Sequence, residues 1–481
     1  MVRFALHTGG PSPAGRRGHS TPQQSWPTVN PADSSDNPDS SDNLEPDQSG
    51  ATELGGTESV AEEPVKPVSP RLELREPLTA VIETQDALDD VCAAIEAGTG
   101  PVALDAERAS GYRYSQRAYL VQVRRQGSGS ALIDPIAFDD LSQLDSAIGD
   151  AEWILHAASQ DLVCLAEIKM RPKALFDTEL AGRLLNLPRV GLAALVESQL
   201  DRSLAKEHSA ADWSTRPLPD PWLHYAALDV EVLVELRDLL DAQLVEAGKR
   251  EWAAQEFEAL LSFTGPPTRK EPWRRTSGIH KARGRRALAV VRALWEARDA
   301  IAADRDITPG RILPDSSILE IAQAAPQDLQ TLKGMRAMRN RGPRRFLSQW
   351  HDAVEHAMGL DEKDLPTIGQ RFDGPPPPRS WADKNPEAAA RLAACREVVA
   401  RIAETHNLPT ENLIAPGSVR ALAWEPPAAH TPEAVADALA AAGARQWQID
   451  LVAAELAVAL DAPPAVPETD KSDSDRPNTT S

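Results

Sequence analysis

The chain has 481 residues, a length typical of two to four domains, and a formal net charge of -21 at pH 7. Much of the negative charge lies between Asp33 and Glu63, a stretch without Lys or Arg, so the charge of the whole chain does not exclude a nucleic-acid partner. No stretch is apolar enough to span a bilayer, residues 1–20 lack the apolar core of a signal peptide, and the three cysteines are scattered. We therefore expect a cytoplasmic protein with reduced thiols and no membrane partner.

Composition divides the chain into tails, linkers and folded segments. Residues 1–76 are rich in Pro, Ser, Gly and acidic side chains and poor in large apolar ones, so they cannot bury enough surface to offset their ordering entropy. We expect a disordered acidic tail there. The other segments that we expect are a folded domain at 77–262, a basic linker at 263–284, a helical domain at 285–362, a Pro-rich linker at 363–383, a second helical domain at 384–461 and a disordered polar tail at 462–481.

The first folded domain alternates short apolar runs with helical patterns. Thr84 is a suitable N-cap for a helix that ends at Gly98, and we interpret Asp177 as the N-cap of a helix at 176–187 rather than as a metal ligand. Strands followed by helices and a further strand predict an α/β domain with a mixed sheet flanked by helices. The strands are expected at 102–107, 119–123, 131–133 and 153–156, with a hairpin turn at 126–129, and the other helices at 141–148, 161–168, 192–200 and 220–245.

Four carboxylates and one phenol come from three of these segments. Asp105 and Glu107 lie two apart at the end of a strand and therefore share a face, while Asp161 follows the strand at 153–156. Tyr225 and Asp229 lie four apart on a helix and face the same way. Asp229 is on the inward face, where a charge is costly unless it is paired or binds a metal. Oxygen ligands in this number suit a pair of hard divalent ions, Mg²⁺ or Mn²⁺.

Three further residues near these carboxylates have an ordinary structural interpretation. His156 ends a strand, and we interpret it as a hydrogen-bonded structural residue rather than a catalytic one. Cys164 lies on the apolar side of its helix and is expected in the core. Arg216 either contacts a phosphate or forms a salt bridge, and the sequence leaves both possibilities open.

Two segments after the first folded domain share a helical pattern. In the first we expect a helix at 285–304, a turn at 308–310 and a helix opened at 314–317, with Asp315 or Ser316 as its cap. The pattern at 311–322 recurs at 412–423 with a constant offset, which indicates two divergent copies of one small all-α domain. Arginines near the third helix of the first copy predict either phosphate contacts to nucleic acid or a solvated surface without a ligand. They are Arg336, Arg339, Arg341, Arg344 and Arg345.

These motifs resemble those of the DEDD superfamily of 3′–5′ exonucleases, specifically the ribonuclease D branch with a Tyr four residues before the last Asp. Residues 104–107, 155–162 and 225–230 are similar to its three motifs, and shorter matches occur at 176–178, 212–213 and 216–218. The segment 285–360 is similar to the HRDC domain of ribonuclease D and of RecQ-type helicases, and 384–461 resembles it more weakly. The resemblance implies a ribonuclease H-like exonuclease domain followed by two HRDC-like domains.

The resemblance also implies a mechanism, in which two divalent ions about 3.5–4 Å apart assist hydrolysis of the last phosphodiester at a 3′ end. Asp105 is then expected to bridge both ions, with Glu107 and Asp229 completing the site of the water-activating ion. Asp161 is expected to hold the other ion through ordered water. Tyr225 is expected to orient the attacking water or to accept its proton.

We therefore expect a metal-dependent 3′–5′ exoribonuclease that trims structured RNA, such as tRNA precursors, and binds RNA with a single-stranded 3′ end. One alternative is a DNA 3′–5′ exonuclease, because no residue reveals a contact to the 2′-hydroxyl. The other is a non-catalytic nucleic-acid-binding protein on an exonuclease scaffold, against which the intact set of carboxylates argues. The sequence leaves the oligomeric state and the choice between Mg²⁺ and Mn²⁺ open.

Overall fold

The computed structural model describes residues 69–204, 210–369 and 374–461. The tails expected at 1–68 and 462–481 therefore lie outside the described residues. Residues 69–76, which the sequence assigns to the acidic tail, contact the first folded domain. Leu72 is buried there, and its N–H donates to the backbone oxygen of Ser203. None of the described helices is long and apolar enough to cross a membrane.

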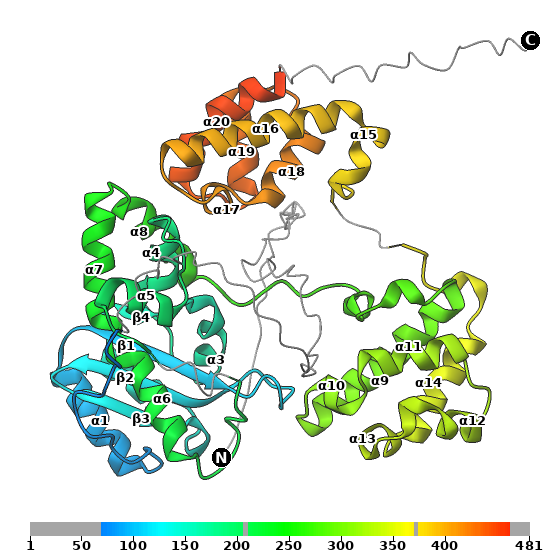
Figure 1. Cartoon of the computed structure of the whole chain (residues 1–481), viewed down its shortest axis with the longest axis horizontal. Coiled ribbons are helices and arrows are strands. Elements are labelled where there is room, and N and C mark those ends of the chain that lie inside the picture. The colour runs from blue at the N-terminus through cyan, green and yellow to red at the C-terminus, as the bar shows by residue number, and fades with distance from the viewer. Residues whose placement is uncertain (1–68, 205–209, 370–373, 462–481) are drawn as a thin grey trace, which may run out of the picture.

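Within the described ranges, five strands form one mixed sheet in the order β3-β2-β1-β4-β5. The central strand β1 pairs antiparallel with β2 and parallel with β4, which confirms the expected α/β class. The hairpin between β2 and β3 turns at Gly127, whose positive φ of 94° suits glycine. The strands are Thr99–Arg108 (β1), Ala118–Gln126 (β2), Gly129–Ile133 (β3), Trp153–Leu155 (β4) and Leu175–Asp177 (β5), shown in Figure 1.

The fifth strand corrects one prediction. The sequence predicts a helix throughout 176–187, but Phe176 lies in β5, pairs with Ile154 of β4 and is fully buried. Helix α4 (Thr178–Leu184) begins only after the strand. Asp177 caps it as predicted, by accepting from the N–H groups of Glu179 and Leu180.

Helices cover both faces of this sheet. On one face, α1 (Gln85–Ala97), which Thr84 caps as predicted, shares a hydrophobic core with α2 (Ser142–Ile148) and α3 (Leu162–Glu167). On the other face, α6 (Asp220–Glu231) packs across β1, β2 and β3. The sequence predicts one helix over 220–245, but the chain leaves the helix at Val232 and begins α7 (Leu233–Glu246). The remaining helices of this domain are α5 (Leu192–Leu200) and α8 (Arg250–Leu261).

The next two units are helical (Figure 1), and three helices of the first, α9 (Arg285–Arg305), α10 (Pro309–Ile312) and α11 (Asp315–Ala324), recur in the second as α16 (Pro386–Thr405), α17 (Thr410–Leu413) and α18 (Pro416–Trp424) at the constant offset that the sequence predicts. A residue with a left-handed backbone follows each long helix, Asp306 (φ 48°) directly after α9 and Asn407 (φ 49°) two residues after the end of α16. The first unit contains α9 (Arg285–Arg305), α10 (Pro309–Ile312), α11 (Asp315–Ala324), α12 (Leu329–Gly334), α13 (Arg341–Arg344) and α14 (Leu347–Gly359). The second contains α15 (Trp381–Lys384), α16 (Pro386–Thr405), α17 (Thr410–Leu413), α18 (Pro416–Trp424), α19 (Pro432–Ala441) and α20 (Gln446–Asp461).

Two local predictions in the first helical unit are wrong. The segment 308–310 is not a free turn, because Pro309 begins the short helix α10. The cap position of α11 is Pro314 rather than Asp315 or Ser316. The Asp315 carboxylate instead accepts from the buried Arg298 guanidinium at 2.6 Å and from the N–H of Ser277 at 2.7 Å. The Asp315 side chain therefore connects the basic linker to α9 through hydrogen bonds.

Both helical units contact the sheet domain through the equivalent residue after their long helix. In the first unit, the Asp306 carboxylate accepts from the Ser115 N–H at 2.8 Å and from the Tyr119 hydroxyl at 3.3 Å. In the second, the Asn407 side chain bonds to Asn186 at 2.8 Å, and its backbone oxygen accepts from the Lys249 ammonium at 2.8 Å. The second unit also shares a hydrophobic core with α4, α7 and α8.

Candidate active site

Strand β1 places two carboxylates on the face of the sheet that α6 covers. Its residues alternate, so that Leu104 and Ala106 are buried in the core on the opposite face while Asp105 and Glu107 point toward α6. Asp105 lies next to Gln122 of β2 in the antiparallel register. The spacing of two residues thus gives the shared face that the sequence predicts.

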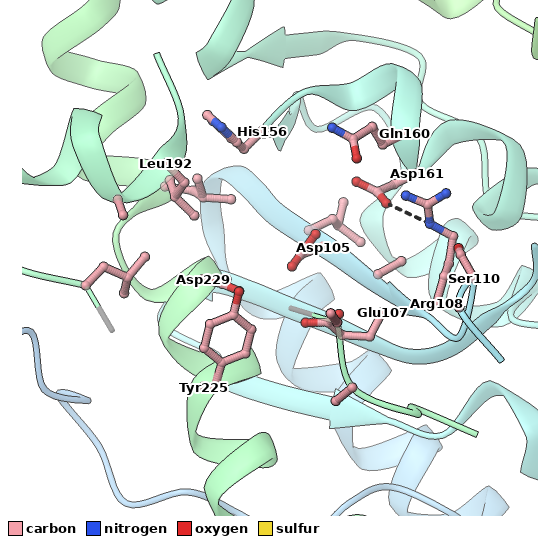
Figure 2. A pocket seen from close by; sticks show the side chains of 18 residues that line it. Asp105, Glu107, Arg108, Ser110, His156, Gln160, Asp161, Leu192, Tyr225 and Asp229 are labelled. Carbon is pink, nitrogen blue, oxygen red and sulfur yellow. Dashed lines mark ion pairs between the residues drawn. The ribbon is translucent and has the colours of Figure 1, made fainter. Parts of the chain in front are cut away.

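Helix α6 brings the third carboxylate to this pair. Ligand oxygens of Asp105, Glu107 and Asp229 all lie within 4.8 Å of one another. Tyr225 lies one turn before Asp229, and its hydroxyl hydrogen-bonds the Asp229 carboxylate. Figure 2 shows the phenol and the carboxylates turned toward the same space.

The loop between β4 and α3 brings Asp161 to the same site. After β4, the chain passes through Ala157 in a left-handed conformation (φ 57°) and a single turn of 3₁₀ helix, Ala158–Gln160, before Asp161 opens α3. Asp161 is buried, and it lines the same cavity as Asp105, Glu107 and Asp229. On its far side, Nε of Arg108 lies 3.9 Å from its Oδ1 atom (Figure 2).

The cavity has a volume of about 690 Å³ and is lined by both polar and apolar side chains. The carboxylates, Tyr225 and Arg108 are among the polar ones. The apolar residues include Leu192, Ala193, Leu204, Ala211 and Leu233.

Burial of several acids together shifts their pKa values upward. Burial raises the pKa of Asp105 to about 6, with Arg108 opposing the shift. Burial, followed by repulsion from Asp105, Asp229 and Asp161, raises the pKa of Glu107 to about 10. Burial, followed by repulsion from Asp105, raises the pKa values of Asp161 and Asp229 well above the usual range of an Asp. These four carboxyl groups are costly to ionise at the same time unless positive charge lies between them, so the site favours multivalent cations. Their oxygen donors fit hard ions such as Mg²⁺ or Mn²⁺.

His156, Cys164 and Arg216 each have partners within the protein, and His156 also lines the cavity. His156 Nδ1 lies 2.9 Å from the Thr178 hydroxyl, and burial lowers the pKa of the imidazole to about 4. Cys164 is buried in the core. Arg216 forms a bidentate salt bridge to the buried Asp134 carboxylate, at 2.6 and 2.8 Å, so the salt bridge is the correct one of its two possibilities.

The predicted arginine cluster lies on the first helical unit and does not line this cavity within the described residues. Arg336, Arg339, Arg341, Arg344 and Arg345 are all exposed, and none forms an ion pair with another described residue. This unit also contacts the rim of the cavity. Arg311 stacks on the Tyr112 ring at 4.0 Å and donates to the backbone oxygen of Gly111, a lining residue, at 3.1 Å.

Two cavity-related residues are missing from the prediction. Arg108 directly follows Glu107, but an arginine at a strand end has no distinctive sequence signal. Asp177 is predicted only as a helix cap, yet its carboxylate also accepts from the N–H groups of Ala157 and Ala158 in the loop that leads to Asp161. Those contacts join segments that are about twenty residues apart.

Three family models match the chain. A 3′-5′ exonuclease model matches residues 79–245, an HRDC domain model matches 287–354, and a 3′ to 5′ exonuclease C-terminal domain model matches 374–460. The first model spans all five strands of the sheet and every carboxylate of the cavity. The third falls on the second helical unit, for which the sequence predicts a further HRDC-like copy.

Curated relatives and solved structures extend this similarity to most of the chain. Ribonuclease D of Gluconacetobacter diazotrophicus is 30% identical over 333 residues, which are 68% of this chain and 81% of that protein. Ribonuclease D of Granulibacter bethesdensis is 30% identical over 305 residues, 61% of this chain and 74% of that protein.

Among solved structures, a protein from Bifidobacterium adolescentis is 40% identical with a TM-score of 0.76, covering 82% of this chain and 100% of that one. Escherichia coli RNase D is 26% identical with a TM-score of 0.56, covering 72% of this chain and 89% of that one. Sequence and structure therefore agree on the ordering of an exonuclease fold followed by helical domains. The chain belongs to the ribonuclease D family of 3′–5′ exonucleases.

Proposed function

We propose that this chain is a metal-dependent 3′–5′ exoribonuclease that removes nucleotides from the 3′ ends of structured RNA, such as tRNA precursors. The observation that carries the proposal is the convergence of Asp105, Glu107 and Asp229 oxygens within 4.8 Å, with Asp161 on the same cavity. A non-catalytic scaffold has no need for buried carboxylates, since each costs stability when it is not paired or bound to a metal.

The metal ligands in this proposal are Asp105, Glu107, Asp161 and Asp229, which together would hold two Mg²⁺ or Mn²⁺ ions. The chemistry that such a pair supplies is activation of the attacking water and stabilisation of charge on the leaving 3′ oxygen. Tyr225, beside Asp229, orients that water or accepts its proton. Arg108 is placed to hold a phosphate oxygen at the same end of the cavity as Asp161.

RNA is the proposed substrate because of the names and descriptions of similar proteins. The two curated relatives from Gluconacetobacter diazotrophicus and Granulibacter bethesdensis are named ribonuclease D, and the Escherichia coli structure is described as an exoribonuclease involved in structured RNA processing. The exposed cluster Arg336, Arg339, Arg341 and Arg344 would bind phosphates of the folded part of the RNA. Such contacts add affinity without reading sequence.

The test is degradation of a 3′-tailed RNA hairpin and a matched DNA hairpin by the full chain with Mg²⁺, Mn²⁺ or chelator. We expect stepwise release of 5′-mononucleotides from the 3′ end of RNA, none in chelator, and none from the Asp105→Ala variant. Equal or faster degradation of DNA would favour the DNA exonuclease. Binding of RNA without release of nucleotides under any metal condition would favour the non-catalytic scaffold.

A further inference from the structure

We propose that Asp177 is a positioning residue, which sets the location of the metal ligand Asp161 through the backbone of the loop between β4 and α3. The proposal rests on the proposed function, because it assumes that Asp161 helps to hold an ion. It concerns a residue that contacts neither substrate nor ion.

Asp177 ends β5, and its carboxylate is buried with an exposed fraction of 4%. Four backbone N–H groups of the described chain donate to it. Those of Glu179 at 2.9 Å and Leu180 at 3.1 Å belong to α4 and make the ordinary helix cap. Those of Ala157 at 3.1 Å and Ala158 at 2.8 Å belong to the loop after β4. Capping α4 does not require this second pair.

The second pair of contacts leads directly to Asp161. The Ala158 N–H donates to Asp177, and the Ala158 carbonyl in turn accepts from the Asp161 N–H at 3.0 Å. Ala158, which is buried, therefore connects the Asp177 carboxylate to the backbone of Asp161. Because Asp161 is the first residue after this 3₁₀ turn, a shift of Ala158 moves the Asp161 carboxylate in the cavity.

The loop also has a conformation that needs support. Ala157 adopts φ 57° and ψ 52°, a left-handed geometry that residues with a Cβ rarely take unless their surroundings hold them there. Its N–H is one of the groups that Asp177 fixes. At the start of the loop, the Thr178 hydroxyl lies 3.3 Å from the Leu155 carbonyl and 2.9 Å from His156 Nδ1. The adjacent residues Asp177 and Thr178 thus hold the first part of the loop, from Leu155 to Ala158.

The chain offers a matched control in Asp328. This aspartate caps α12 in the first helical unit, where it accepts from the N–H groups of Gln330 at 2.9 Å and Thr331 at 2.8 Å. Among the described residues, Asp328 has no contact with the loop and does not line the cavity. Asp328→Asn therefore makes the same Asp-to-Asn change at a helix cap without affecting the support of the loop.

The experiment measures Mn²⁺ binding to the full chain by calorimetry or electron paramagnetic resonance, for the wild type, Asp177→Asn and Asp328→Asn. The Asp177→Asn amide keeps one acceptor oxygen for the N–H groups that now donate to Oδ1, but its NH₂ group faces the Ala158 N–H that donates to Oδ2. The contact that leads to Asp161 is therefore lost. We expect one of the two Mn²⁺ ions to bind roughly 10- to 100-fold more weakly, as is typical when a supporting group of a metal ligand is lost. The ion held by Glu107 and Asp229 should keep its affinity, and Asp328→Asn should bind both ions as the wild type does.

A second variant separates positioning from folding if Asp177→Asn does not fold. Asp177→Ser keeps a good N-cap for α4, but its side chain is too short to reach the Ala157 and Ala158 N–H groups as well. It should show the same selective loss of Mn²⁺ affinity, and excess Mn²⁺ should restore most of its turnover. Folded Asp177 variants with wild-type affinity for both ions would overturn this inference and leave the proposed function intact. A wild-type chain that binds no Mn²⁺ would overturn the proposed function and the inference with it.

Discussion

Nε of Arg108 lies 3.9 Å from Oδ1 of Asp161, at the end of the cavity opposite Tyr225. Among the described residues that line the cavity, Arg108 is the one Lys or Arg. Its guanidinium opposes the rise in the pKa values of Asp105, Glu107 and Asp161 that burial causes. A substrate phosphate would enter a space whose other charged side chains are acidic.

Replacing Arg108 should therefore weaken substrate turnover. We expect Arg108→Gln to lower kcat/KM for a 3′-tailed RNA by roughly 10- to 100-fold, since a hydrogen bond to a charged group contributes about 1.5–3 kcal/mol. Arg108→Lys keeps the charge and should recover part of that loss. Single-turnover kinetics of the three proteins measures this, and a Gln variant with wild-type kcat/KM would show that Arg108 only neutralises Asp161.

Tyr225 should act on the reaction rather than on metal binding. We expect Tyr225→Phe to lower kcat by about 10²- to 10⁴-fold, the range for a lost proton-transfer group, while leaving Mn²⁺ affinity nearly unchanged. The ring still fills its place beside Asp229, so the packing of α6 is retained. Calorimetric titration of the variant with Mn²⁺ is the check, and a large loss of affinity would make Tyr225 a metal ligand instead.

The grouped acids predict a pH dependence of stability in the metal-free chain. The folded-state pKa values of Asp105 (about 6) and Glu107 (about 10) lie above their unfolded values. Their neutral forms therefore favour folding, and this contribution is complete below about pH 4 and is lost as pH rises through about 6 and then about 10.

We test this with thermal unfolding in chelator of the wild type and of an Asp105→Asn/Glu107→Gln variant, whose amides do not titrate. The Tm of the variant should exceed that of the wild type by a few degrees more at pH 8 than at pH 5. Added Mg²⁺ should reverse the order by stabilising the wild type alone. A Tm difference that does not change between pH 5 and pH 8 would contradict the burial of these acids.

The exposed arginines should supply a salt-dependent part of RNA affinity. Neutralising Arg339, Arg341 and Arg344 to Gln removes up to three phosphate contacts, each worth about 0.7 (single strand) to 0.9 (duplex) in the slope of log K against log salt. We expect the slope to fall by up to about 2 to 3. Filter binding to a 3′-tailed hairpin from low to moderate salt is the measurement.

The control for that experiment carries the same change of charge elsewhere. Arg379, Lys384 and Arg396 are exposed on the second helical unit, and their triple Gln variant should retain most of the salt slope. A cluster variant with the wild-type slope would mean that the arginine cluster is a solvated surface. An equal decrease of the salt slope in both variants would mean that the net charge of the protein, rather than the arginine cluster, determines the affinity for RNA.

Local sequence patterns predicted much of the sheet domain. Four strands, the hairpin turn and the Thr84 and Asp177 caps follow from alternation, glycine and capping chemistry, all of which act over a few residues. The strand β5 was missed because its three residues run directly into a helix, and because pairing with β4 rather than local preference makes Phe176 extended. The break at Val232 was missed because both helices continue one apolar pattern.

In the candidate site, too, some features are predictable from local sequence patterns and others are not. The carboxylates were found because each lies in a short motif with its own periodicity. The contacts around the carboxylates are not predictable from the sequence, because they join segments that are far apart in the chain. Examples are the hydrogen bond between Asp177 and Ala158 and the stacking of Arg311 on Tyr112. Sequence periodicity carries no information about such pairs, and only the tertiary arrangement brings them together.

The central claim is that carboxylates from β1, α3 and α6 hold a pair of divalent ions. Its most direct test is the number of Mn²⁺ ions bound per chain in the presence of a nucleoside 5′-monophosphate, compared between wild type and Asp105→Ala. The account predicts two ions for the wild type and the loss of at least one for the variant, with no hydrolysis at any Mg²⁺ concentration. Two ions bound by Asp105→Ala with wild-type affinity, or near-normal hydrolysis by that variant, would contradict it.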